Sequence, residues 1–172
     1  DVLVLEVDER YAKIVFKYFK PNYFAITNLS RDQLARHGHY DVVYDDIARV
    51  ISDDMHLLLN ADDPFVCKLA QNHKGKVTYF GIGEHENVEK EVLMDTLDLA
   101  YCPVCHSKLV FDYYHYGNLG KYSCPNHDFD RPVCDYEVTS IDMNKHRFVI
   151  NGAVNVAIQH DIIYNIYNNL VV

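Results

Sequence analysis

Two short cysteine-containing turns are the stretches of this sequence whose residue types and spacing most clearly indicate chemistry. The first is Cys102-Pro-Val-Cys105 and the second is Cys124-Pro-Asn-His127. Each turn presents two soft or borderline ligands at the spacing that zinc-binding turns use. The residues between them, with short strands expected at 108–113 and 120–123, are enough for a hairpin that brings the turns together. We predict a zinc site held by Cys102, Cys105, Cys124 and His127.

The fourth zinc ligand remains open when spacing alone is considered. His127 stands where a second Cys-x-x-Cys turn would end, whereas Cys134 offers a softer sulfur seven residues further on, beyond Arg131-Pro132. We favour His127 because its spacing matches the first turn. The competing interpretation, unrelated buried cysteines, does not account for two Cys-Pro turns. Four protein ligands leave no open coordination position, so the zinc is expected to be structural.

Acidic and amide side chains follow several apolar runs of the sequence. Glu6 closes the first run, Asn28 follows the second, and Asn60 with Asp62 and Asp63 follows the third. Glu6 forms an acidic cluster with Asp8 and Glu9, and the carboxylate oxygens of this cluster suit a hard cation such as Mg²⁺. The alternative is that these residues only cap the ends of strands and helices. The sequence has no HExxH, GxSxG or GxxxxGK[ST] motif, so the residues alone leave the chemistry undecided.

The elements that would position these side chains alternate between strand and helix. We expect strands at 1–6, 23–27, 55–60 and 76–80, and helices at 9–19, at 41–51 and from Asp62 or Asp63, with Pro64 in the first turn. This order predicts an α/β domain with a parallel sheet flanked by helices. Ligands of such sheets bind beyond the carboxyl ends of the strands. Residues 1–98 and 135–172 would form this domain, with a β-like stretch at 135–150 and a helix from Ile163. The zinc ribbon, 99–134, would be an insertion.

Composition narrows the class of protein. The 172 residues carry a net charge of −9, which argues against general binding to nucleic acid. No stretch is apolar over the length of a membrane span, and no signal peptide or lipidation motif is present, so we expect a soluble, cytoplasmic protein. Four of the five cysteines lie in the ribbon region, which favours metal binding in a reducing compartment over disulfides.

Several motifs occur in an order that resembles the central ATPase domain of the Mur ligases. They are Leu5-Glu6-Val7-Asp8-Glu9, Pro21 with Thr27-Asn28-Leu29-x-Arg31-Asp32-Gln33-Leu34-x-Arg36-x-Gly38, and Leu59-Asn60-Ala61-Asp62-Asp63-Pro64. The inserted ribbon and the closing Tyr164-Asn165-Ile166-Tyr167-Asn168 are similar to one branch of that family. This branch comprises the ligase-like MurT subunits of lipid II isoglutaminyl synthases. The resemblance extends over nearly the whole chain.

The resemblance implies a specific reaction and specific residues. The reaction is ATP-dependent amidation of the D-glutamate α-carboxylate in the lipid II stem peptide, with ammonia from a GatD-type glutamine amidotransferase partner. Glu6 matches a Mg²⁺-binding glutamate, and Gln33 stands where many members have a histidine near a second metal. Asn165 and Asn168 match asparagines near the adenine and ribose of ATP. Asn28 belongs to the same expected cofactor site.

The sequence also departs from the family pattern. The phosphate-binding loop is expected before Asp1 and the carboxy-terminal domain after Val172, so we expect a fragment that is inactive alone and holds no assigned catalytic residue. His127 replaces the usual fourth cysteine, and Ile162 and Ile163 replace a glycine expected before Tyr164. A second interpretation is a non-catalytic zinc-ribbon binding module on an α/β scaffold. A third is another Mur-type ligase, such as a folylpolyglutamate synthase, against which the zinc ribbon argues.

Overall fold

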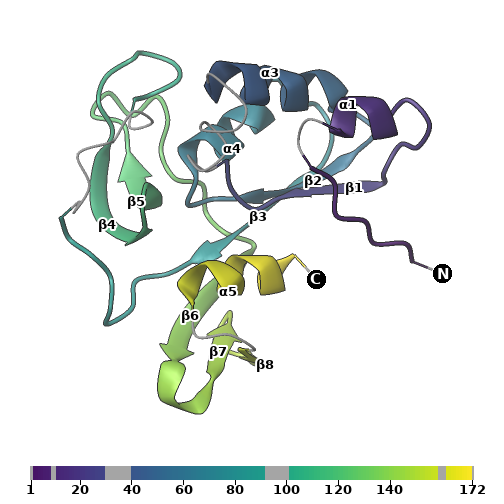
Figure 1. Cartoon of the computed structure of the whole chain (residues 1–172). Helices are drawn as coiled ribbons and strands as arrows, with labels where there is room; N and C mark the ends of the chain where they lie inside the picture. Colours follow the sequence, from purple (N-terminus) through teal and green to yellow (C-terminus); the bar gives the residue numbers. More distant parts are fainter. Residues whose placement is uncertain (1, 9–10, 30–39, 92–100, 159–161, 172) are drawn as a thin grey trace.

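The computed structural model describes residues 2–8, 11–29, 40–91, 101–158 and 162–171, and its centre is a six-stranded mixed sheet (Figure 1). In spatial order the strands are β1 (Tyr23–Ile26), β2 (His56–Asn60), β3 (Val77–Ile82), β6 (Tyr136–Asp142), β7 (Arg147–Ile150) and β8 (Val154–Ala157). From β1 to β6 the neighbours are parallel, whereas β6, β7 and β8 pair antiparallel. The prediction of a parallel sheet is confirmed for four strands and wrong for β7 and β8. These follow β6 through η3 (Met143–Lys145) and a short turn, connections that suit antiparallel pairing.

One face of the sheet is covered by helices α1 (Ala12–Val15), α3 (Tyr40–Val50) and α4 (Pro64–Lys68), the last continuing as η2 (Leu69–Asn72) (Figure 1). Val43 and Ile47, four residues apart on α3, are buried against alternate residues of β2, Leu57 and Leu59. The predicted helix at 41–51 is therefore confirmed with its apolar face inward. The predicted helix at 9–19 is shorter, because only four residues are α-helical and turns follow.

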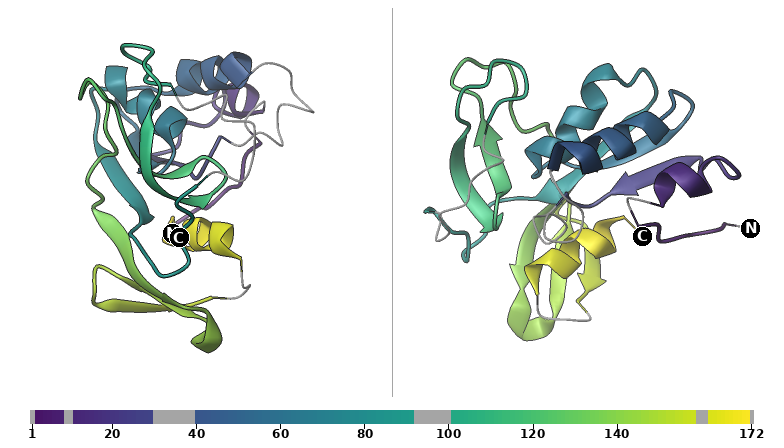
Figure 2. Two further views of the ribbon diagram at one scale, coloured as in Figure 1. Left: turned by 90° about the vertical axis from the view of Figure 1, so that its left-hand side faces the viewer. Right: turned by 45° about the horizontal axis from the view of Figure 1, so that its top comes forward.

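Helix α5 (Ile163–Leu170) covers the opposite face (Figures 1 and 2). Its Ile166 and Tyr167 are fully buried, and they pack with Phe80 and Ile82 of β3 and Phe148 of β7. The helix contacts β3, and the Tyr167 hydroxyl and the amide of Ile82, the last residue of β3, donate to the same oxygen of Asp62. Within the described parts of the chain, no helix is long and apolar enough to cross a membrane.

Strands β4 (Val110–Tyr116) and β5 (Leu119–Ser123) form a separate antiparallel hairpin beside the sheet (Figure 2). The hairpin turns at Gly117, whose φ of 55° is a conformation that favours glycine. Tyr122 and Leu109 pack with Cys67 of α4 and with two of the paired-turn cysteines, Cys102 and Cys124. The expected hairpin between the two turns is therefore present. The outline of the ribbon as an insertion at 99–134 stays a prediction.

The amino-terminal segment differs from its prediction. Residues 2–8 form no strand, and the side chains of Val2, Leu3 and Val4 are 92%, 68% and 78% exposed. An apolar run becomes a buried strand only where a neighbouring strand takes up its backbone hydrogen bonds. Among the described residues no strand pairs with this segment. The prediction of a buried strand at 1–6 is wrong for this structure, and Glu6 is exposed.

Candidate functional site

Three cysteines meet at the base of the hairpin. The sulfur atoms of Cys102, Cys105 and Cys124 all lie within 4.8 Å of one another, and the Cys105 and Cys124 sulfurs are 3.4 Å apart. Tetrahedral zinc with Zn–S bonds of about 2.3 Å places its sulfurs roughly 3.8 Å apart. The donor set and its spacing therefore fit a zinc ion. Among the residues that the structure describes, no other group of three or more His, Cys, Asp and Glu side chains comes together in this way.

Backbone and side-chain N–H groups point at these sulfurs. The amides of Val104 and Cys105 donate to Cys102 Sγ at 3.4 and 3.5 Å, and the Asn126 amide donates to Cys124 Sγ at 3.4 Å. Such donors stabilise negative charge on sulfur, which a metal ligand requires. Hydrogen bonds from Ser107 and Asn126 lower the pKa of Cys105 to about 7, while burial raises the pKa of Cys102.

The two candidates for the fourth ligand lie apart from the three sulfurs. The His127 side chain is 83% exposed, and its Nδ1 lies 3.7 Å from Asp130 Oδ2. His127 N donates to Cys124 O at 2.8 Å, which closes a tight turn with His127 at φ 56°. This turn is one residue shorter than the first, where His106 N donates to Cys102 O. His127 therefore stays a prediction that requires its ring to rotate toward the sulfurs.

Cys134 faces a different part of the molecule. A side-chain carbon added to Gly81 of β3 would lie 2.9 Å from Cys134 Sγ, so this sulfur sits against β3. Burial raises the pKa of Cys134 to about 12, which disfavours the thiolate that zinc binds. The group of three sulfurs does not include it.

The residues expected to bind nucleotide and magnesium are only partly placed. Glu6 lies in the exposed segment 2–8, and Asn28 follows β1 with a half-buried side chain. Gln33 lies outside the described residues. Asn165 and Asn168 lie on α5, half-buried and exposed respectively. The burial of Glu6, which would have required a compensating cation, is not observed, so its assignment rests on the resemblance.

The end of β2 is held by buried polar side chains. Asn60 Nδ2 donates to Thr27 O at 2.7 Å, and its Oδ1 accepts from the Asp62 amide at 3.0 Å. Asp63 caps α4 by accepting from Phe65 N, and its other oxygen accepts from Leu29 N at 2.9 Å. Burial raises the pKa of Asp63 to about 6, although these donors act in the opposite direction. The competing interpretation, capping, is therefore confirmed for Asp63.

The sequence did not single out the buried ion pair that lies next to this cap. Arg131 Nε donates to Asp62 Oδ1 at 2.6 Å, and the two side chains are 9% and 0% exposed. Arg131 also donates to Glu137 Oε1 and to Ile82 O, each at 3.2 Å. Burial acts to lower the pKa of Arg131, but the negative charge of Asp62 outweighs it and the pKa is raised. Gly81 leaves room for the pair, because a side-chain carbon there would lie 2.9 Å from Arg131 Nη2 and 3.0 Å from Asp62 Oδ1, but a glycine in the sequence does not by itself indicate an ion pair.

A pair of histidines extends this buried cluster. His115 Nε2 lies 2.8 Å from Ile82 O, and its Nδ1 lies 3.2 Å from His85 Nε2. A carbonyl oxygen only accepts, so His115 carries its proton on Nε2 and its Nδ1 accepts from His85. Burial lowers the pKa of His115 and also that of His85. The neutral form of His115 is therefore the one that fits the folded protein.

Protonation of His115 is expected to destabilise the fold. The folded pKa lies below the unfolded value of about 6.5, so the unfolded state binds more protons in this window. The stability that His115 provides is present above that value and is lost as the pH falls through the folded pKa. In urea titrations, the advantage of wild type over His115→Gln should therefore shrink on acidification.

The comparison with His115→Gln isolates this histidine from its surroundings. The groups that face His115 are present in both proteins; they are His85, Asp62, Arg131 and the ring of Tyr113. Asp63, whose raised pKa changes stability in the opposite direction, is also common to both. A difference in unfolding free energy that stays constant with pH would contradict the assignment.

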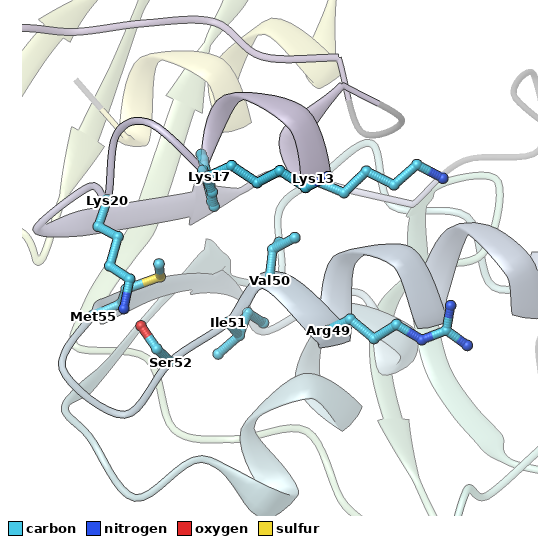
Figure 3. A pocket seen from close by; sticks show the side chains of 9 residues that line it. Lys13, Lys17, Lys20, Arg49, Val50, Ile51, Ser52 and Met55 are labelled. Carbon is cyan, nitrogen blue, oxygen red and sulfur yellow. The ribbon is translucent and has the colours of Figure 1, made fainter.

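A surface pocket of about 380 Å³ lies between α1 and the end of α3, and Figure 3 shows the side chains that line it. Lys13 and Arg49 extend to the same side, where both lie near Asp46, at 2.7 and 3.8 Å. Met55 at its edge immediately precedes β2, so the pocket lies at the amino end of that strand. Ligands of parallel sheets bind at the opposite end, so this pocket does not support the nucleotide site.

Comparisons with known proteins place the chain in a family. The family model of the Mur ligase middle domain matches residues 1–126. The chain is 36% identical over 143 residues to the MurT subunit of the lipid II isoglutaminyl synthase (glutamine-hydrolyzing) of Staphylococcus aureus (strain COL), covering 83% of this chain and 32% of that protein. It is 33% identical over 177 aligned positions to the corresponding MurT subunit of Streptococcus pneumoniae (strain R6), covering 99% and 38%.

A solved structure of a peptide ligase has a similar fold. The pseudomurein peptide ligase type C from Methanothermus fervidus matches with a TM-score of 0.68 and 27% identity, over 87% of this chain and 29% of that one. The chain thus spans roughly a third of the length of each relative. Because the family model covers residues 1–126 of 172, the chain belongs to the Mur ligase family, as a middle domain.

Proposed function

We propose that the protein containing this chain amidates the D-glutamate α-carboxylate of the lipid II stem peptide, with ATP and with ammonia from a GatD-type glutamine amidotransferase subunit. The observation that carries the proposal is the identity of 36% and 33% to MurT subunits whose names state a glutamine-hydrolysing lipid II isoglutaminyl synthase. The reaction would serve peptidoglycan synthesis, with the enzyme in the cytoplasm and lipid II at the membrane surface.

The proposed reaction has two steps. A carboxylate oxygen of the substrate attacks the γ-phosphorus of ATP, which releases ADP and leaves an acyl phosphate. Ammonia then attacks the acyl carbon, phosphate leaves with the shared oxygen, and the amide of D-isoglutamine remains after loss of a proton. Because phosphoryl transfer needs little covalent help from a protein, the residues act mainly by positioning and by charge.

The residues proposed for the nucleotide site are Glu6, Asn28, Gln33, Asn165 and Asn168. Glu6 offers one carboxylate, and Mg²⁺ in phosphoryl-transfer enzymes is commonly held by one or two carboxylates together with substrate phosphates. When bound, Mg²⁺ would neutralise charge on the transferred phosphoryl group. Asn165 and Asn168 supply amide donors and acceptors suited to adenine and ribose. A zinc ion at Cys102, Cys105, Cys124 and His127 would hold the proposed ribbon, 99–134, together.

The assay that tests this function uses the full-length protein with its amidotransferase subunit. Lipid II, ATP, Mg²⁺ and glutamine are expected to give ADP and amidated lipid II in equal amounts, and omission of any one should stop both. Formation of ADP without an amidated product would overturn the proposal and favour another Mur-type ligase. Absence of both activities in an intact complex would favour the binding module.

Substitution of Glu6 tests the magnesium assignment. In the full-length complex, Glu6→Gln should lower the rate of amidation roughly 10²-fold, the size expected for loss of one charge-stabilising group. Because Glu6 is exposed and outside the packed core, stability and zinc content should not change. Glu9→Gln is the matched control and should have a much smaller effect. Near-normal turnover of Glu6→Gln at saturating Mg²⁺ and ATP would contradict the magnesium assignment and would mean that Glu6 is only a solvated acid on the surface.

A further inference from the structure

Asp62 connects three separate parts of the chain. Its Oδ1 accepts from Arg131, in the segment after the second cysteine turn, at 2.6 Å. Its Oδ2 accepts from the Ile82 amide at the end of β3 at 2.7 Å and from the Tyr167 hydroxyl of α5 at 2.8 Å. Since Asp62 is fully buried, water does not compete for these contacts. The hairpin side and α5 therefore share one carboxylate.

Arg131 is fixed to the hairpin and not only to Asp62. Its backbone amide donates to Tyr122 O of β5 at 3.0 Å. In the same strand, the Gly120 amide donates to the backbone oxygen of Asp62 at 3.0 Å. A displacement of the hairpin that carries the cysteines would therefore move both the guanidinium and the backbone that hold Asp62.

Tyr167 determines how α5 is rotated about its axis. Its side chain is fully buried, and burial raises the pKa of its hydroxyl well above the usual range, so it donates. Asn165 and Asn168, on the same helix, are half-buried and exposed. Because successive helical residues are about 100° apart around the axis, fixing Tyr167 fixes the directions of both asparagines.

We propose that Asp62 is a positioning residue through which the cysteine hairpin and Arg131 orient α5, and thereby the two asparagines that meet the nucleotide. The proposal rests on the proposed function for the role of Asn165 and Asn168. The contact between hairpin and helix is independent of that function, because it consists of the hydrogen bonds from Arg131 and Tyr167 to one carboxylate.

The experiment compares Tyr167→Phe, Arg131→Lys and the double variant in the full-length complex. Each single change is expected to weaken ATP binding about tenfold, the factor that 1.4 kcal/mol represents, because one charge-assisted hydrogen bond is lost. The double variant should bind ATP about as weakly as either single one, since both act through Asp62. Zinc content should not change. Effects that multiply in the double variant would overturn the coupling.

The matched control is Tyr164→Phe, on the same helix. Tyr164 is 42% exposed, and its ring lies 6.5 Å from the Tyr116 ring, outside the Asp62 cluster, so this variant should bind ATP normally. Hydrogen exchange of α5 amides, measured without ATP, separates the two proposals. Faster exchange in Tyr167→Phe and Arg131→Lys supports the coupling between the hairpin and α5, whether or not ATP binds. Failure of the wild type to bind ATP would refute only the assignment of Asn165 and Asn168 to the nucleotide. Unchanged exchange in both variants overturns the coupling.

Discussion

Substitution of Cys105 by serine is expected to abolish zinc binding and to unfold the β4–β5 hairpin while most of the six-stranded sheet stays folded. The Cys105 sulfur lies 3.4 Å from that of Cys124, so its loss removes one of three convergent ligands. Structural zinc contributes about 10–16 kcal/mol to folding in small metal-binding peptides, and an isolated two-stranded hairpin is marginal without support. The sheet keeps its own buried clusters on both faces.

Two measurements follow this change. Elemental analysis should find about one zinc per wild-type chain, as one tetrahedral site requires, and none in Cys105→Ser. Hydrogen exchange should become fast over β4 and β5 but stay slow over β2 and β3. Zinc retained in Cys105→Ser, or loss of protection across the whole sheet, would contradict this account.

The fourth ligand is tested by two further variants. His127→Ala should weaken zinc binding, whereas Cys134→Ser should retain zinc, because the Cys134 sulfur faces Gly81 rather than the other three sulfurs. Loss of zinc from Cys134→Ser, together with normal zinc binding by His127→Ala, would identify Cys134 as the fourth ligand. It would also require the segment around Arg131 to move away from β3.

Replacement of Asp62 by alanine is expected to cost about 3–5 kcal/mol of the free energy of unfolding, the range observed when one partner of a buried ion pair is removed. The Arg131 guanidinium, which is 9% exposed in the wild type, would keep Glu137, at 3.2 Å, as its one charged partner among the residues that the structure describes. The Ile82 amide and the Tyr167 hydroxyl would also lose their acceptor. Domains of this size have roughly 5–15 kcal/mol in total, so this loss would be visible in urea or thermal titrations.

An exposed ion pair on the same hairpin provides the control. Lys121 Nζ and Asp112 Oδ2 are 2.9 Å apart, but their side chains are 51% and 55% exposed. Water already solvates both charges, so Asp112→Ala should cost less than about 1 kcal/mol. If Asp62→Ala and Asp112→Ala lowered the free energy of unfolding by similar amounts, the buried ion pair would contribute no more to stability than the exposed one, which would contradict this prediction.

Local patterns in the sequence were enough to predict much of the fold. The apolar stripe of α3, the Asp63–Pro64 start of α4 and the two Cys-Pro turns depend on neighbours within a few residues, and the structure has all three. The prediction of a strand at 1–6 was wrong for a physical reason, because an apolar run carries no information on which strand will pair with it. The antiparallel pairing of β7 and β8 likewise depends on short turns rather than on apolar pattern.

The buried cluster around Asp62 could not be predicted from local patterns. Arg131 and Tyr167 are 69 and 105 residues from Asp62 in sequence, and each looks like an ordinary loop or helix residue by itself. Asp62 was recognised only as a possible cap, a role that the structure gives to Asp63. Long-range ion pairs depend on the final topology, here on the hairpin packing against the end of β3.

The most direct test of the proposed amidation through an acyl phosphate follows one carboxylate oxygen of the substrate. Lipid II carrying heavy oxygen in its D-glutamate α-carboxylate would be incubated with the full-length protein, its amidotransferase subunit, ATP, Mg²⁺ and glutamine. Passage through an acyl phosphate transfers one labelled oxygen to the phosphate released with each amide formed. The account therefore predicts labelled inorganic phosphate in step with amidated lipid II. Amidated product accompanied by unlabelled phosphate would contradict it.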